Sequence, residues 1–94
     1  MSFHKQEFHQ FPSEKGLQAQ VGYLLQQMNR LYPNNKIKLA LEHSSGFYNL
    51  MRVYEGGTMD RIVSGDTKRD MQNILTALQN YTNLLLDVAG KFPK

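Results

Sequence analysis

Two stretches of this chain with helical periodicity, residues 16–29 and 71–86, contain no charged residue, although charged residues make up 20% of the sequence. A helix on the surface of a globular domain buries one stripe and usually presents Lys, Glu, Arg and Asp on its opposite face. In these two stretches the opposite face carries Gln, Asn, Thr, Ala and Gly instead. The sequence therefore indicates two helices whose outer faces have a reason other than solvation to lack charge.

The first predicted helix begins after residue 13, from where apolar residues recur at steps of three and four. Ser13 suits the N-cap position and Glu14 the first turn, and Pro33 ends the helix at about residue 31 or 32. The expected core stripe consists of Leu17, Val21, Leu24, Leu25, Met28, Leu31 and Tyr32. On the outer face, Ala19 and Gly22 are small enough to let another backbone approach, although a merely tolerated glycine explains Gly22 equally well.

Three segments of strand length separate the two helical stretches. Residues 36–42 alternate between apolar side chains and Lys or Glu, as a half-buried strand does. Residues 47–54 are rich in aromatic and branched side chains, and residues 59–64 follow a glycine pair that suits a tight hairpin connection. Both faces of the segment 47–54 carry apolar side chains, so the pattern leaves open which of its faces is buried.

The second predicted helix begins after Thr67, which forms a capping-box pattern with Asp70 three residues later, and it ends near Gly90. Its expected core stripe consists of Met71, Ile74, Leu75, Leu78, Thr82, Leu85 and Ala89. At 100° per residue, a second apolar band lies beside this stripe. The band consists of Ala77, Tyr81, Leu84 and Val88. Leu84 lies well outside the face that should meet a sheet, so this helix has more apolar surface than a two-layer fold requires.

The 94 residues suffice for one compact domain and are too few for two. The element order predicts an α+β fold, α-β-β-β-α, in which two helices cover one face of a three-stranded antiparallel meander. We assign residues 13–90 to this domain, 91–94 to a C-terminal tail and 1–12 to an N-terminal arm. The three phenylalanines of the arm, Phe3, Phe8 and Phe11, fit either a frayed terminus or an arm that packs on its own domain or a second copy.

Composition excludes several classes of protein. The chain contains no cysteine, which rules out disulfides, thiolate catalysis and Cys-based zinc sites and is compatible with a cytoplasmic location. Neither a targeting segment nor an apolar run of the roughly 18 residues that a membrane span needs is present, so we expect no membrane partner. The net charge of +3 is spread along the chain, which permits contact with nucleic acid without indicating it.

No arrangement of residues suggests catalysis. The histidines His4, His9 and His43 lack the spacing of a helical metal site, and the glycines do not form a phosphate-binding loop. The acidic residues near the strand ends show no pairing for acid–base work. We therefore expect a protein that is not an enzyme and that needs neither a metal nor another cofactor.

The cations Lys68 and Arg69 stand in the first turn of the second predicted helix, where they oppose the helix dipole. Two explanations are open. Asp66 and Asp70 can compensate them as neighbours, or the helix N-terminus and the two cations together bind a phosphate group.

The element order and this basic helix start resemble the double-stranded-RNA-binding domain family. Lys68 and Arg69 match the first two cations of the family's Lys-Lys-x-x-Lys cluster, Gln72 stands at the third, and His43 represents the histidine of the family's strand loop. The resemblance implies binding of A-form duplexes by the first helix, the first strand loop and the start of the last helix. Binding of duplex RNA or DNA through Lys68, Arg69, Gln72 and His43 is therefore the alternative function.

The strand of residues 46–54, followed by the glycine pair 56–57, resembles in style the small accessory proteins of bacteriophages and prophages of Gram-positive bacteria. This resemblance implies a protein that modulates host or phage machinery in the host cytoplasm by binding another protein. We therefore expect a protein-interaction module that also forms a homo-oligomer. The residues expected to contact its partner are Ala19, Gly22, Ala77, Tyr81, Leu84 and Val88.

Overall fold

The computed structural model describes residues 12–91. All of the predicted arm except Pro12, and residues 92–94 of the predicted tail, lie outside the described residues. The elements are α2 (Glu14–Leu31), β1 (Lys38–Ser44), β2 (Phe47–Val53), β3 (Met59–Gly65) and α3 (Lys68–Val88). The strands form one antiparallel sheet in the order β1-β2-β3. The predicted α+β class and the order α-β-β-β-α are thus confirmed.

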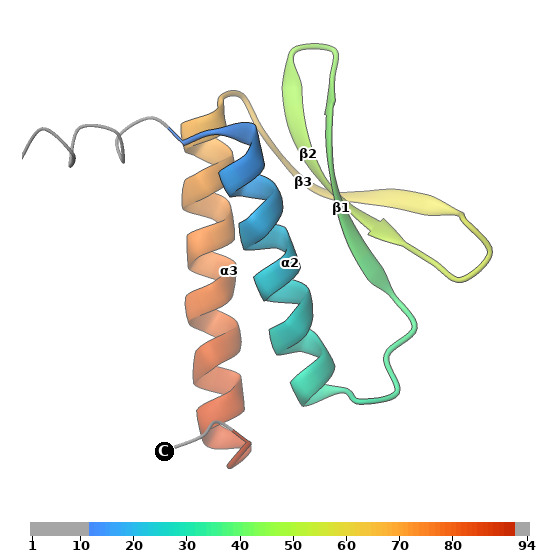
Figure 1. The fold of residues 1–94 in the computed structure, drawn as a ribbon, viewed down its shortest axis with the longest axis vertical. Helices are drawn as coiled ribbons and strands as arrows, with labels where there is room; N and C mark the ends of the chain where they lie inside the picture. Colours follow the sequence, from blue (N-terminus) through green and yellow to red (C-terminus); the bar gives the residue numbers. More distant parts are fainter. Residues whose placement is uncertain (1–11, 92–94) are drawn as a thin grey trace, which may run out of the picture.

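The two helices lie side by side on one face of the sheet and run in the same direction (Figure 1). Both begin where the sequence predicts. The backbone N–H of Gly16 donates to the Ser13 hydroxyl over 2.9 Å, and that of Asp70 donates to the Thr67 hydroxyl over 3.0 Å. These caps satisfy donors that the first turn of a helix leaves without a partner. Because the two helices run in the same direction, their starts lie at the same end of the molecule.

The core lies between the upper halves of the helices and the sheet. Its buried members are Leu17, Val21, Leu24, Tyr48, Leu50, Met71 and Leu75. Tyr48 and Leu50 come from β2, which settles the facing that the sequence left open: this face of the strand turns toward the helices. Burying a side chain of this size stabilises a fold by roughly 1.5–3 kcal/mol relative to leaving it exposed.

The end of β3 packs tightly against the start of α3. A Cβ atom added to Gly65 would lie 2.9 Å from the backbone nitrogen of Met71 and 3.2 Å from the Cβ of Asp70. Real Cβ atoms essentially never approach a neighbouring atom as closely as the first of these distances, so only glycine fits without a shift of the backbone. This contact fixes the sheet to the upper end of α3.

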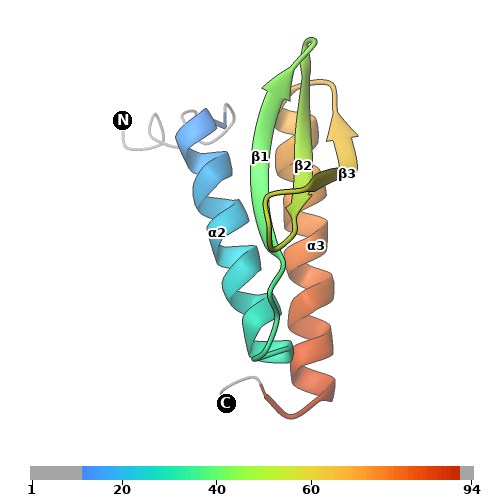
Figure 2. The ribbon, with the colours of Figure 1, turned by 90° about the vertical axis from the view of Figure 1, so that its right-hand side faces the viewer.

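A β-bulge separates the sheet into two parts. Leu50 pairs with Val63, and the next residue of β2, Met51, pairs with Arg61, so Ile62 is an extra residue in β3. A bulge bends its strand and increases the local twist. Below it the β2–β3 hairpin points away from the helices, and the strands leave the lower half of α3 uncovered (Figure 2).

This geometry corrects the two predicted core stripes at the lower ends of the helices. Tyr32 and Ala89 are exposed, and the prediction that they belong to the core was wrong. Leu86 and Gln27, which neither predicted stripe contained, are buried instead. The stripes assumed a sheet along the whole length of each helix, whereas the lower halves bury the side chains that face the other helix.

Candidate functional site

The apolar band predicted on the last helix forms a largely exposed surface on the lower half of α3. Tyr81, Leu84 and Val88 are 60%, 57% and 77% exposed, Ala77 is also exposed, and Leu85 between them is half-buried. We call the residues Ala77, Tyr81, Leu84, Leu85 and Val88 the α3 strip. Large apolar side chains that gather on one surface, rather than being scattered singly, mark a site of contact.

One edge of the α3 strip continues the sheet-facing side of the helix beyond the end of the sheet. Residues seven apart on a helix point in nearly the same direction. Ile74 and Leu78 pack against the core in the upper half of α3, and Tyr81 and Leu85 follow them at this spacing. Tyr81 and Leu85 therefore have the same facing as these core residues, whereas Leu84 and Val88 follow the exposed Ala77 and Tyr81 at the same spacing and lie further from the sheet-facing side.

The opposite flank of α3 is closed by α2 through uncharged polar side chains. The Gln20 side chain donates to the Thr76 hydroxyl over 3.3 Å, and Gln79 donates to the Gln20 carbonyl oxygen over 3.4 Å. Seven residues further along α2, the Gln27 side-chain N–H donates to Asn83 Oδ1. These contacts explain much of the missing charge within the chain itself, because amides and hydroxyls bond to each other without bringing net charge into the seam.

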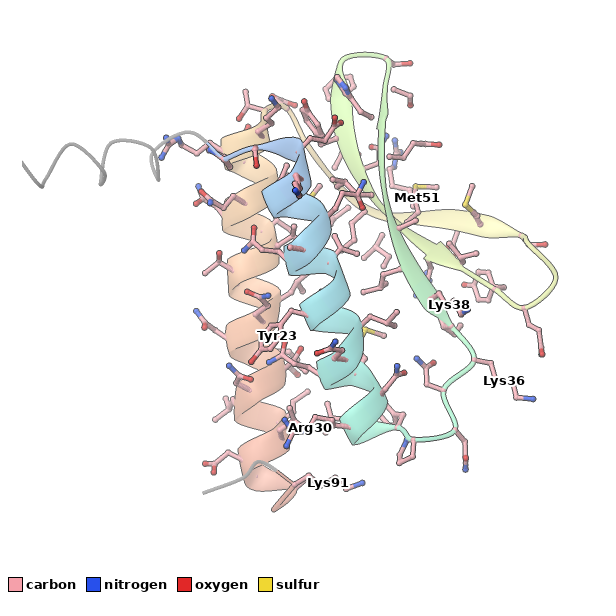
Figure 3. All side chains as sticks on the ribbon, viewed as in Figure 1. Tyr23, Arg30, Lys36, Lys38, Met51 and Lys91 are labelled. Atoms are coloured by element: carbon pink, nitrogen blue, oxygen red, sulfur yellow. The ribbon has the colours of Figure 1, made fainter. Side chains whose placement is uncertain are left out.

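Gln27 is the most buried polar residue of this seam, at 2% exposure. Its Oε1 atom has no hydrogen-bond partner, so its amide is only half satisfied. Charged side chains begin below it, where Arg30 donates to the Lys91 carbonyl oxygen over 3.3 Å and Lys91 donates to that of Leu31 over 3.4 Å. Figure 3 shows Tyr23, Arg30 and Lys91 following one another down the seam between the two helices.

An apolar hollow of about 190 Å³ adjoins the α3 strip. It lies where the sheet bends away from the helices. It is lined by Leu24, Met28, Leu39, Leu50, Arg52, Ile62, Leu78 and Thr82. Ile62, the extra residue of the bulge, is 42% exposed there. This volume is below the roughly 300 Å³ at which small-molecule sites begin, so the hollow suits a single side chain of a protein partner better than a ligand.

Beside the hollow, the β2–β3 hairpin carries a polar group of side chains that has no net charge. Arg52 forms a bidentate pair with Asp60, with N–O distances of 3.0 and 3.1 Å, and the Tyr54 hydroxyl donates to the same carboxylate over 3.0 Å. The hydrogen bond from Arg52 is the main reason that the pKa of Asp60 lies below its ordinary value. The hairpin therefore presents a neutral polar pair beside the hollow that Arg52 and Ile62 line.

Ala19 and Gly22, the other two predicted contact residues, are exposed on the outer side of α2. An added Cβ on Gly22 would meet nothing within 4 Å. The α3 strip lies on the flank of α3 that faces away from α2, because Thr76, Gln79 and Asn83 occupy the flank that contacts it. The six predicted residues thus form two separate surfaces, and their role in binding a partner stays a prediction.

The predicted nucleic-acid residues show no excess of positive charge at the starts of the helices. Lys68 and Arg69 are exposed, Gln72 is half-buried, and the exposed His43 stacks on Tyr48 with ring centroids 4.1 Å apart. The parallel helices add Lys15 to the same end of the molecule, while Glu14, Asp66 and Asp70 also lie there. Three cations are thus offset by three carboxylates.

Other kinds of site were searched for within residues 12–91. No group of three or more His, Cys, Asp or Glu side chains in this range is placed to hold a metal ion. None of the helices in the described part of the chain is long and apolar enough to cross a membrane. A shallow hollow of about 500 Å³ between residues 36–38 and 53–57 and another of about 340 Å³ beside Asp66 and Asp70 are open to solvent.

Comparison of the chain with protein-family models, with curated proteins and with solved structures finds no match.

Proposed function

We propose that this protein is a non-enzymatic interaction module that binds another protein chain through the α3 strip. The observation that carries this proposal is the exposure of three large apolar side chains, Tyr81, Leu84 and Val88, on one flank of α3. Protein interfaces are depleted in Lys, Glu and Asp at their centre and contain large apolar and aromatic side chains. The strip has this composition, and the adjoining hollow offers space for an anchoring side chain.

A role as an accessory protein of a phage or prophage belongs to the same proposal. It rests on the resemblance of the strand 46–54 in the sequence. That resemblance concerns the biological context of the protein and does not identify the residues that contact the partner. A small module that modulates a larger machine needs one contact surface and no catalytic group. The α3 strip is the surface on which such a module would depend.

Binding of nucleic acid through Lys68 and Arg69 is the second candidate. The parallel helices favour it, because both helix N-termini, where partial positive charge accumulates, lie at the same end of the molecule. The carboxylates of Glu14, Asp66 and Asp70 oppose it. Salt-dependent binding of duplex RNA that is lost when Lys68 and Arg69 are changed to Ala would support this function, and no binding at low salt would end it.

The proposed function is tested by photo-crosslinking inside the cell from which the chain comes. A photo-reactive amino acid is placed at position 81 in the strip and, as a matched control, at position 47, where Phe47 is 45% exposed at the other end of the molecule. We expect position 81 to form a defined adduct with a protein, a second copy of this chain included, and the Leu84→Asp variant to abolish it. Equal labelling from positions 81 and 47, or adducts that Leu84→Asp leaves intact, would refute the proposal.

A further inference from the structure

The buried amide pair between α2 and α3 stands where an apolar pair would fit at no greater cost. Gln27 is 2% exposed and follows the core residue Leu24 by about one turn of α2, and its side-chain N–H donates to Asn83 Oδ1. Replacing both partners of a buried hydrogen bond by apolar side chains of similar shape is often neutral or favourable for stability. Buried polar groups are retained in some helix pairs because they determine how the helices meet. Stability alone therefore does not account for this amide.

The lower half of α3 offers α2 two flanks of unequal polarity. At about 100° per residue, Asn83 lies about 100° to one side of the buried Thr82, and Leu85 lies about 60° to its other side. The flank with Asn83 carries amide side chains, whereas the flank with Leu85 continues to the exposed apolar ring of Tyr81. Burial of apolar area alone favours contact with the second flank. The structure nevertheless places α2 on the first.

Space for the other arrangement lies beside the helices. The apolar hollow of about 190 Å³ is lined by Met28 of α2 together with Leu78 and Thr82 of α3. Below the bulge the β2–β3 hairpin points away from the helices (Figure 2). Further up, the core that the helices share with the sheet holds both helices. A small change in the angle between the helices therefore moves the lower end of α2 into the hollow and toward Leu85.

We infer that the pair of Gln27 and Asn83 keeps α2 on the polar flank of α3 and thereby keeps the α3 strip at the surface. A shift of α2 toward Leu85 separates the two amides and leaves a buried one without its partner, which costs more than a hydrogen bond ordinarily contributes. The bond from Gln20 to Thr76 belongs to the same flank, but it is exposed and water can replace it. This selection takes place within one chain and does not depend on which partner binds the strip.

Thiol labelling tests the selection, because the chain contains no cysteine and any introduced thiol is unique. Leu85→Cys reports on the flank toward which α2 would shift, and Ala19→Cys, on the outer side of α2, is the matched control. Each reporter is placed in the wild-type chain and in the double variant Gln27→Leu with Asn83→Leu, and its rate of reaction with a maleimide is measured. We expect the double variant to slow the labelling of Leu85→Cys by at least about threefold, which requires the shifted arrangement in about two thirds of the molecules. Ala19→Cys should react equally in both backgrounds.

Denaturant unfolding of the same chains separates the selection of a flank from a purely structural role. The double variant is expected to be at least as stable as the wild type while Leu85→Cys reacts more slowly. Gln27→Met, which keeps the volume of the side chain and lacks the amide, is the second variant should the first not fold, as judged by circular dichroism. Unchanged or faster labelling of Leu85→Cys in a folded variant would overturn the inference. Because the purified chain is measured alone, this outcome is independent of the crosslinking that tests the proposed function.

Discussion

The two flanks of α3 lack charge for different reasons. On one flank, Thr76, Gln79 and Asn83 contact α2 through uncharged hydrogen bonds, so their polar groups find partners within the chain. On the other, Tyr81, Leu84 and Val88 are exposed and nothing within residues 12–91 covers them. The comparison teaches that an uncharged helix face is not by itself a binding surface. Only the flank whose side chains remain exposed after the chain has folded needs a partner.

The largest effect is expected at the point where the sheet covers the helix. Leu75→Ala removes a fully buried side chain and should destabilise the fold by about 2–5 kcal/mol, measured by denaturant unfolding. Leu84→Ala, the same substitution nine residues further along α3, should change the free energy of unfolding at low protein concentration by less than about 0.5 kcal/mol. Similar losses for the two variants would mean that the strip is covered within the monomer, and the comparison would fail.

The attachment of the sheet to α3 gives the next effect. Gly65→Ala places a Cβ 2.9 Å from the Met71 backbone nitrogen and should destabilise the fold by about 1–3 kcal/mol. Gly22→Ala meets no atom within 4 Å and should stabilise α2 by up to about 1 kcal/mol. The midpoints of thermal unfolding compare a glycine in close contact with a neighbouring backbone with a glycine that has free space around it. A Gly65→Ala variant as stable as the wild type would contradict the contact that holds the upper part of the sheet to α3.

The α2-facing flank is tested by Asn83→Ala. This change leaves the buried Gln27 amide without the acceptor for its N–H and should cost about 1–3 kcal/mol. The control is Asn80→Ala, on the exposed face of the same helix, which should be nearly neutral. The double variant Gln27→Leu with Asn83→Leu should regain most of the loss, because it leaves no unsatisfied amide. If urea unfolding shows no difference between Asn83→Ala and Asn80→Ala, the seam contributes nothing to stability.

The smallest effect concerns the ion pair of Arg52 and Asp60 on the β2–β3 hairpin. Because Arg52 holds the pKa of Asp60 below its ordinary value of 3.8, the folded form binds this proton less readily than the unfolded form. The stabilisation is therefore present above the unfolded pKa and is lost as the pH falls through the folded pKa. Asp60→Asn should flatten the loss of stability between about pH 5 and pH 2. Arg52→Gln removes the same pair from the other side. If the two variants lose stability differently as the pH falls, the pair is not the cause of the pH dependence.

Local patterns predicted the elements well, because caps, periodicity and turn residues act within a few positions. Ser13, Thr67 and the order of the five elements followed from such patterns, and so did the apolar band of α3. The facing of β2 did not, since both of its faces carry apolar side chains and the choice depends on packing. The bulge at Ile62 and the burial of Gln27 were missed for the same reason. They follow from how far the sheet extends along the helices, which no local pattern encodes.

The candidate site was predicted in part, and its limits have a physical cause. Helical periodicity identified Tyr81, Leu84 and Val88 as lying off the core stripe, and the structure places them at the surface. It did not separate them from Ala19 and Gly22, because the pairing of α2 with α3 decides which flanks share a surface. Leu85 was assigned to the core, whereas it lies half-buried within the strip, since the sheet ends above it.

The most direct test of the account is photo-crosslinking from position 81, because it asks whether the exposed α3 strip contacts another protein chain. The account predicts a defined protein adduct from position 81, which position 47 does not form and which Leu84→Asp abolishes. Equal labelling from positions 81 and 47, or an adduct that Leu84→Asp leaves intact, would contradict it.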